Sequence, residues 1–235
     1  MPRFGGVLFD VDETLYDREA AQDRILRDLV VRLPGLLGGL TEEAVLAAFA
    51  ESDQRTADHF LTAGTVEASR DQRSRIFLEL LGRPPGGARQ VSAAYVEAYR
   101  CTAAAIPGAT ATVRRCARHL PVGIVSNAFA DVQYHKIDSL GIRHLLACIV
   151  LSEEFGVRKP AAAIFLEGCR ALGTAPAETL YVGDSYGNDV VGAAGAGLVP
   201  CWFNPSGAAA PEKGPRPDCE IRALAEVATV LGLPD

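Results

Sequence analysis

Short apolar runs that end at a polar residue or a glycine recur along the chain. The first occupies residues 6–9, directly before Asp10, and the others lie at 122–125, 147–151, 180–182 and 198–203. Segments with helical spacing of apolar residues separate the later runs, at 109–119, 130–140, 161–172 and 189–196. Buried strands that alternate with helices are typical of βαβ units, so the pattern predicts an α/β fold with a parallel sheet.

One long stretch breaks this alternation. Between residues 17 and 105 no strand pattern occurs, and apolar residues recur at helical spacing, as in Ile25, Leu29 and Leu33. Proline and glycine pairs such as Pro34-Gly35 divide the stretch into separate helices. We therefore predict a helical insertion at 17–105 within a core of residues 1–16 and 106–235. A loop at 205–218 would precede a last helix near 222–231.

Polar side chains follow four of the predicted strands. In a parallel sheet the carboxyl ends of the strands meet at one edge, where ligands bind, so these side chains are expected to converge. Three of the groups come directly after their strands, and the lysine follows its strand by a few residues. The set comprises four carboxylates, a hydroxyl, an amide and an ammonium: Asp10, Asp12, Asp184, Asp189, Ser126, Asn127 and Lys159.

This combination of residue types suits a magnesium ion and a phosphoryl group. Mg²⁺ prefers carboxylate, carbonyl and water oxygens, which Asp10 and Asp184 can supply. A carboxylate can also attack phosphorus, and Asp12, two residues from Asp10 on the same side of an extended chain, can handle the leaving-group proton. Each group alone also fits a solvated turn or a helix cap. Together, in this order at strand ends, they indicate one site.

The overall composition restricts the classes of function. The chain has 235 residues, 49% of them hydrophobic, with a net charge of −6 and a pI near 5.3. This acidic balance argues against a dedicated nucleic-acid or anionic-membrane binder, whose surface would be basic. Taken alone, it also argues against anionic substrates. Lysine is rare, at positions 136, 159 and 213 beside twenty arginines, which makes Lys159 informative.

Several sequence features favour a cytoplasmic location. The apolar run before Asp10 is too short for a secretory signal peptide. Glycines and prolines interrupt the uncharged stretch 190–211, so it does not fit a membrane-spanning helix. The six cysteines are at least 15 residues apart in sequence, and no CxxC pair occurs. We interpret them as reduced, small buried apolar residues.

Four segments resemble the motifs of a known enzyme family. DVDETLYD, VSNAF, RKP and GDSYGND are similar to the four motifs of the haloacid dehalogenase (HAD) superfamily of aspartyl-phosphate hydrolases. The resemblance covers residues 5–17 and 106–204, and the insertion resembles the cap that this family places between its first two motifs. It implies an α/β fold: a Rossmann-like parallel sheet core with an inserted α-helical cap domain. It also implies Mg²⁺-dependent hydrolysis of phosphomonoesters.

The resemblance further implies a role for each matching residue. Asp10 would be the nucleophile, Asp12 the general acid and then the base, and Lys159 would stabilise the intermediate. The substrate-binding residues would be Thr14, Ser126 and Asn127. Thr14 would also support the first loop. The magnesium ligands would be Asp10, the backbone carbonyl of Asp12, Asp184, and Asp189, the last directly or through water.

Within the superfamily, the sequence favours the phosphatases. The family's dehalogenases lack the second aspartate of the first motif, present here as Asp12, and its phosphonatases use a cap lysine, which 17–105 lacks. The stretch from Asp131 through LSEEFGVRKP to CWFN is similar to the pyrimidine 5′-nucleotidase and N-acylneuraminate-9-phosphatase group. We expect a monomer or homodimer that acts on a small phosphorylated metabolite, such as a nucleoside monophosphate or sugar phosphate. Neither a nucleic acid polymer nor a membrane is an expected partner.

Three other functions stay open from the sequence. A phosphomutase would form the same aspartyl-phosphate and return the phosphoryl group to the substrate. A phospho-accepting signalling module also combines acidic residues, a hydroxyl and a lysine, although the insertion and Asp12 disfavour it. A catalytically silent HAD-like scaffold would act by binding a partner.

Two groups of side chains in the insertion have uncertain chemical significance. The aromatic residues Phe49, Phe60, Tyr95 and Tyr99 are interpreted as packing residues rather than a platform for base stacking. The arginines are interpreted as a solvated helix face, among them Arg70, Arg73 and Arg75.

Overall fold

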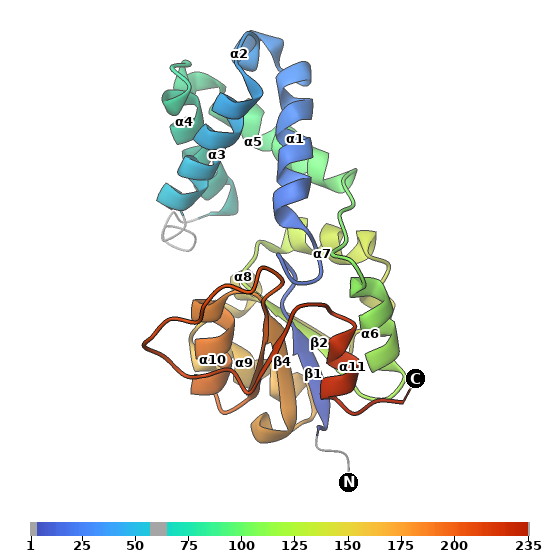
Figure 1. Ribbon diagram of the computed structural model, residues 1–235. Helices are drawn as coiled ribbons and strands as arrows, with labels where there is room; N and C mark the ends of the chain where they lie inside the picture. The colour runs from blue at the N-terminus through green and yellow to red at the C-terminus, as the bar shows by residue number, and fades with distance from the viewer. Residues whose placement is uncertain (1–3, 57–64, 235) are drawn as a thin grey trace. The chain divides into compact units, whose positions relative to one another are not determined.

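A computed structural model describes residues 4–56 and 65–234 (Figure 1). It divides into two compact units, which we call the core unit (Met1–Arg18 and Ala104–Asp235) and the helical unit (Glu19–Ala103). Phe60 lies outside the described residues. In the part of the chain that is described, no helix is long and apolar enough to cross a membrane.

The core unit is built on a six-stranded parallel sheet with the strand order β3-β2-β1-β4-β5-β6. The predicted α/β fold with a parallel sheet is confirmed. The strands are β1 (Gly6–Phe9), β2 (Val122–Ser126), β3 (Cys148–Leu151), β4 (Thr179–Gly183), β5 (Val199–Phe203) and β6 (Cys219–Ile221). The chain order departs from the sheet order between β1 and β4, which makes their carboxyl ends a topological switch point where ligands bind in such sheets.

The sixth strand is absent from the sequence prediction. β6 has three residues, and it pairs with β5 at the edge of the sheet. Of its residues only Ile221 is fully buried, while Glu220 is exposed. A single buried apolar residue after a loop rich in proline and glycine gives no periodic signal, so the strand could not be found from the pattern.

Helices cover both faces of the sheet (Figure 1). Helix α9 packs on β2 and β3 and α10 on β5, whereas α6 packs on β2 and α11 on α6. The helices of the core unit are α6 (Ala109–Ala117), α7 (Ala130–Ser139), α8 (Ser152–Phe155), α9 (Ala162–Leu172), α10 (Val191–Gly195) and α11 (Glu226–Val230).

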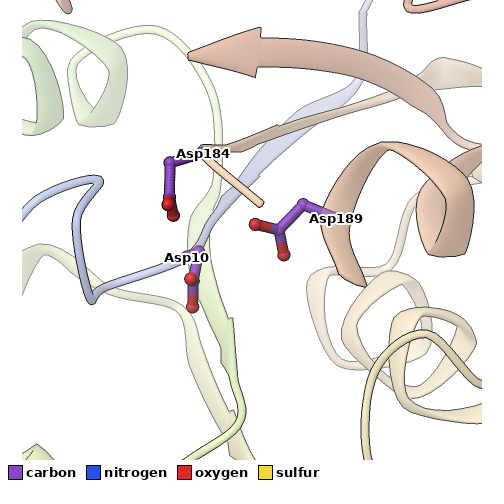
Figure 2. A group of neighbouring side chains, drawn as sticks. All are labelled: Asp10, Asp184 and Asp189. Atoms are coloured by element: carbon purple, nitrogen blue, oxygen red, sulfur yellow. The ribbon is translucent and has the colours of Figure 1, made fainter. Parts of the chain in front are cut away.

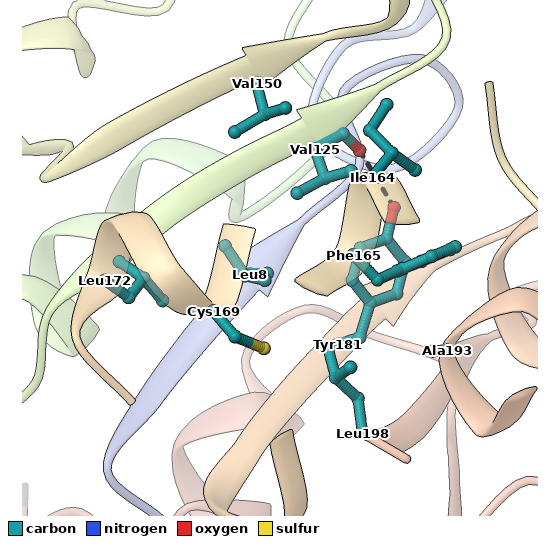
Figure 3. Close-up of a cluster of buried hydrophobic side chains, with 10 residues drawn as sticks. All are labelled: Leu8, Val125, Val150, Ile164, Phe165, Cys169, Leu172, Tyr181, Ala193 and Leu198. Carbon is teal, nitrogen blue, oxygen red and sulfur yellow. Dashed lines mark hydrogen bonds between the residues drawn. The ribbon is translucent and has the colours of Figure 1, made fainter. Parts of the chain in front are cut away.

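One apolar cluster fills the space between the sheet and α9 (Figure 3). Leu8 from β1, Val125 from β2 and Phe165 from α9 are fully buried in it. Gly168 lets the helix approach closely, because a Cβ there would lie 2.7 Å from Val125 and 2.8 Å from Leu8. Tyr181 on β4 belongs to the same cluster, and its hydroxyl lies 2.9 Å from the Val125 carbonyl oxygen. The tight packing fixes the strands whose ends carry the polar residues.

The helical unit buries aromatic side chains at its centre. Its helices are α1 (Arg18–Arg32, whose first residue belongs to the core unit), α2 (Pro34–Leu37), α3 (Glu42–Thr56), α4 (Val66–Leu80) and α5 (Ala88–Arg100). Phe49 stacks on Tyr95 at 4.9 Å and meets Phe77 edge-on at 5.5 Å. Phe49, Tyr95 and Tyr99 are buried, as expected for packing residues.

The interpretation of the α4 arginines as a solvated face is wrong for two of them. Arg70 is buried, and the Arg73 guanidinium lies 4.8 Å from the ring centroids of both Phe49 and Tyr95. Its Nη1 also lies 3.0 Å from Asp53 Oδ1. A guanidinium is weakly hydrated and stacks well on aromatic rings, so Arg73 extends the aromatic core instead of facing water.

We expect Phe49→Ala to destabilise the protein by about 3–5 kcal/mol, because it removes a fully buried ring and leaves a cavity. Leu80→Ala on α4 is the matched control, since Leu80 is 39% exposed, and its effect should stay within about 1 kcal/mol. Urea unfolding followed by far-ultraviolet circular dichroism measures both. Equal losses in the two variants would contradict the central position of Phe49.

Candidate active site

Three carboxylates converge at the carboxyl ends of the two central strands (Figure 2). Asp10 follows β1, and its backbone N–H donates to the Val182 carbonyl oxygen of β4 at 2.9 Å, which continues the pairing of the strands. Asp184 follows β4 directly. Together with Asp189, they offer carboxylate oxygens that all lie within 4.8 Å of one another. The sheet register therefore fixes the spacing between Asp10 and Asp184.

A wide turn after β4 returns Asp189 to the strand end. Residues Tyr186–Val190 form a π-helical turn that Ser185 precedes, and the Asp189 N–H donates to the Ser185 carbonyl oxygen at 2.7 Å. Asp189 Oδ2 in turn accepts the Ser185 N–H at 2.9 Å. Gly183 is required here because any Cβ at that position would overlap the Asp189 carboxylate. The turn thus packs a buried carboxylate directly over the strand.

Lys159 supplies a buried positive charge to these carboxylates. Its Nζ lies 2.8 Å from Asp10 Oδ1 and 2.7 Å from Asp189 Oδ1. The contact to Asp10 is an ion pair without the angles of a hydrogen bond. Nζ also donates to the Tyr181 hydroxyl at 3.0 Å. A buried ammonium needs such partners, since its desolvation is otherwise costly.

The Asn127 side chain holds the backbone of Lys159. Its Nδ2 donates to the Lys159 carbonyl oxygen at 3.0 Å, and its Oδ1 accepts the Lys159 N–H at 2.8 Å. In this structure the Asn127 amide fixes the position of the lysine, and its contact with phosphate stays a prediction. The half-buried Asn127 side chain therefore acts on the site by holding Lys159 in place.

Ser126 ends β2 and is buried beneath the site. Its hydroxyl accepts a hydrogen bond from Gln133 Nε2 at 3.0 Å, which leaves the Ser126 proton able to donate elsewhere. Gln133 lies on α7 and is fully buried, and its Oε1 has no hydrogen-bond partner among the described residues.

Thr14 joins the first loop to the loop after β4. Its hydroxyl accepts the Asp184 N–H at 3.1 Å and donates to Asp184 Oδ1 at 3.2 Å. The family resemblance implies two roles for Thr14, as a support of the first loop and as a substrate-binding residue. The bonds in this structure are those of the first role, because both orient Asp184.

Asp12 lies outside the cluster of three carboxylates and is paired with a different lysine. Lys136 Nζ on α7 lies 2.6 Å from Asp12 Oδ1, and both side chains are largely buried. The next residue, Glu13, has a φ of 56°, a left-handed conformation that is uncommon outside glycine. Asp12 thus sits at a sharp bend of the first loop.

Burial dominates the electrostatics of the cluster. Burial raises the pKa of Asp10 to about 6, with Lys159 opposing the rise and Asp189 adding to it. Burial likewise raises the pKa of Asp184 to about 8, to which the charges of Asp10 and Asp189 contribute. For Lys159, burial acts to lower the pKa, but Asp10 and Asp189 outweigh it and raise the pKa. Lys159 is therefore charged, while Asp10 and Asp184 hold their protons to a higher pH than a free aspartate does.

The cluster fits a divalent cation. All three side chains offer oxygen, the ligand type that Mg²⁺ prefers. Asp10 Oδ1 is buried and accepts no hydrogen bond from any described residue, although Lys159 is near. Besides burial, the neighbouring carboxylates contribute to the raised pKa values of Asp10 and Asp184, and a cation would offset that negative charge.

Three residues of the site were not found from the sequence. Tyr181 looks like an apolar strand residue, yet its hydroxyl contacts Lys159 and lies 3.2 Å from Asp189 Oδ1. Gln133 and Lys136 lie three residues apart on α7, so they share one helix face. The signal available in the sequence was a pair of polar residues at helical spacing, one of them a rare lysine.

A family model matches most of the chain. The model for haloacid dehalogenase-like hydrolases matches residues 4–197, which include every residue of the cluster. The chain belongs to this family. The resemblance of its four motifs to the HAD superfamily is therefore confirmed.

The chain is similar to named phosphatases and to a solved structure of the same family. A glyceraldehyde 3-phosphate phosphatase from Methanopyrus kandleri is 32% identical over 200 residues, which cover 82% of this chain and 81% of that protein. The pyrimidine 5′-nucleotidase YjjG of Escherichia coli is 28% identical, and the match covers 96% of each chain. The magnesium-bound HAD-hydrolase YfnB of Bacillus subtilis has a TM-score of 0.84 at 26% identity, covering 98% of this chain and all of that one.

We expect the stability of the metal-free protein to fall as the pH rises from about 5 to about 8. The folded-state pKa values of Asp10 and Asp184 lie above the value of 3.8 for a free aspartate, so the folded state holds these protons more tightly. This contribution is full at low pH and is lost as the pH passes through the folded values. Unfolding in EDTA at several pH values measures it.

Asp184→Asn should raise the free energy of unfolding at pH 8 in EDTA by about 2 kcal/mol, because it removes a carboxylate that is costly to ionise. The gain should shrink at pH 5. Asp218→Asn, at an exposed position, is the control and should change neither value. A wild-type stability that is flat between pH 5 and 8, with no gain in Asp184→Asn, would contradict the raised pKa.

Proposed function

We propose that the chain is a Mg²⁺-dependent phosphomonoester hydrolase that acts on a small phosphorylated metabolite through an aspartyl-phosphate. The observation that carries this proposal is the Asp10 carboxylate, which lies at a strand end with one oxygen 2.8 Å from Lys159 and two further carboxylates within reach. A nucleophile beside a fixed positive charge suits attack on an anionic phosphoryl group. Membership in a hydrolase family agrees with it.

In the first step, an Asp10 oxygen forms a bond to phosphorus while the bond from phosphorus to the ester oxygen breaks. The electron pair of that bond leaves with the ester oxygen, and Asp12 donates the proton that makes it an alcohol. Lys159 faces the charge of the phosphoryl group, and Ser126 offers it a hydroxyl proton. The products of this step are the alcohol, the aspartyl-phosphate and ionised Asp12.

In the second step, water attacks phosphorus and Asp12 accepts the proton of that water. The bond between Asp10 and phosphorus breaks, which returns the Asp10 carboxylate and releases inorganic phosphate. Asp12 therefore ends the cycle protonated, as it began. Lys159 stays charged throughout, because its partners Asp10 and Asp189 raise its pKa.

We propose that Asp10, Asp184 and the backbone carbonyl of Asp12 bind the cation. When bound, Mg²⁺ supplies positive charge that offsets the carboxylates and the phosphoryl oxygens. Asp189 already accepts from Lys159 and the Ser185 N–H and lies beside the Tyr181 hydroxyl, which favours a contact through water. A magnesium-bound structural relative supports the choice of metal.

We propose that residues 17–105 act as a cap domain that shields the site from water and selects the substrate. The YfnB structure, at 26% identity, reveals interdomain movement, which supports a moving cap. Named relatives include phosphatases of a sugar phosphate and of nucleotides. We infer the same range for this chain: a nucleoside monophosphate or a small sugar phosphate.

Asp10→Asn should lower phosphate release at least about 10³-fold, because an amide oxygen is a poor nucleophile and forms no stable acyl-phosphate. The variant should keep its fold, since Asn matches the shape of Asp. Phosphate release from a panel of about a hundred phosphomonoesters identifies the substrate and tests the variant. Asp218→Asn is the matched control, and wild-type turnover by Asp10→Asn would refute the mechanism.

Removal of divalent metal should abolish phosphate release, and added Mg²⁺ should restore it, because the cation offsets the charge of the three carboxylates. Asp184→Asn should raise the Mg²⁺ concentration needed for half-maximal activity by at least about tenfold. Activity that survives EDTA would contradict the metal assignment. Isomerised product without released phosphate would instead identify a phosphomutase.

A further inference from the structure

A second buried ammonium lies beside the site, and the two steps proposed above do not use it. Lys136 is on α7, and its side chain is 6% exposed. Its Nζ is 2.6 Å from Asp12 Oδ1 and 5.5 Å from the centroid of the Tyr16 ring. A lysine is seldom buried without a partner that requires its charge. In this chain, with three lysines, two are buried at the same edge of the sheet.

These two contacts of Lys136 are with the loop that carries Asp12. Asp12 and Tyr16 form a bridge across this loop, and the Glu13 N–H donates to the Tyr16 carbonyl oxygen at 2.8 Å. Tyr16 is fully buried, so its ring is a fixed surface for the ammonium. Lys136 thus joins α7 to both ends of a tight bend.

Asp12 needs such an anchor more than Asp10 does. Asp10 is bonded to β4 through its backbone N–H, whereas Asp12 lies past the paired strand, beside the left-handed Glu13. A carboxylate at a bend has rotational freedom that a proton-transfer group must give up. The ion pair with Lys136 removes this freedom at Oδ1.

The ion pair leaves part of the Asp12 carboxylate reachable. The contact uses Oδ1, and the side chain of Asp12 keeps 23% of its surface exposed. The ion pair occupies Oδ1, so we take Oδ2 as the oxygen that exchanges the proton in this proposal. Lys159, by contrast, is paired with Asp10 and Asp189 of the cluster and not with Asp12.

We propose that Lys136 is a positioning residue that orients Asp12 toward the ester oxygen of the substrate. This inference rests on the proposed function, in which Asp12 gives a proton to the leaving group. Lys136 therefore affects turnover only of substrates whose leaving group needs that proton. Lys136 touches neither the phosphoryl group nor the nucleophile in this role.

The test compares two substrates of similar size, p-nitrophenyl phosphate and benzyl phosphate. The first has a leaving group that departs without a proton, and the second releases an alkoxide that requires one. For Lys136→Met, kcat/KM should fall about 100-fold on benzyl phosphate and less than about threefold on p-nitrophenyl phosphate. The ratio kcat/KM is used because it reports the steps up to departure of the leaving group.

Three further variants separate positioning from a general structural role. Lys136→Arg should recover most of the loss on benzyl phosphate, because it keeps the charge near Asp12. In an Asp12→Asn background, Lys136→Met should have no further effect on either substrate. Lys213→Met, at an exposed position, is the matched control and should match the wild type.

The outcomes separate the two proposals. Equal losses on both substrates, or no loss on benzyl phosphate, would overturn the role of Lys136 while hydrolysis by the wild type stands. If Lys136→Met does not fold, Lys136→Gln takes its place, since it also removes the charge, and the same two criteria decide. A wild type that hydrolyses neither ester overturns the proposed function and this inference together.

Discussion

The buried ion pairs of Lys159 with Asp10 and Asp189 are the constraint on which the site depends. Removing two carboxylates and an ammonium from water is costly unless each is paired in good geometry. The surroundings meet that condition in detail: Asn127 fixes the lysine backbone, Tyr181 contacts its Nζ, and the turn after β4 packs Asp189 over Gly183. Each of these supports helps to hold the ion pairs in good geometry, so they act as one unit.

The charge balance of the site explains why an acidic chain can accept an anionic substrate. Its net charge of −6 describes the whole molecule, whereas the pocket is set by a few buried groups. Four aspartates, if ionised, contribute −4, and Lys159 with Lys136 contributes +2. In the resting site, before Asp12 takes up the proton that it later donates, a divalent cation would bring the local sum to zero. Without Lys136, the four aspartates, Lys159 and the metal would sum to −1, so Lys136 supplies the charge that brings the site to zero.

The sequence predicts those parts of the structure that depend on neighbouring residues. Continuous apolar runs mark five of the six strands, and the polar residues behind them include Asp10, Asp184 and Asp189 of the cluster. Contacts between distant segments leave no such pattern. Lys136 and Asp12 are 124 residues apart, and the half-buried position of Arg73 depends on rings from α3 and α5. Asn127 was found as a site residue, but its bond to the Lys159 backbone required the fold.

The two aspartates of the first motif illustrate how rigidity is distributed at such a site. Asp10 inherits its position from the sheet, because its backbone N–H continues the pairing of β1 with β4. Asp12 lies two residues further, where the pairing has ended and Glu13 turns the chain at a φ of 56°. A nucleophile must meet phosphorus at one position, and a strand end provides it. A proton carrier must serve first an ester oxygen and then a water, and at a bend outside the sheet the ion pair with Lys136 supplies the orientation that the strand end gives to Asp10.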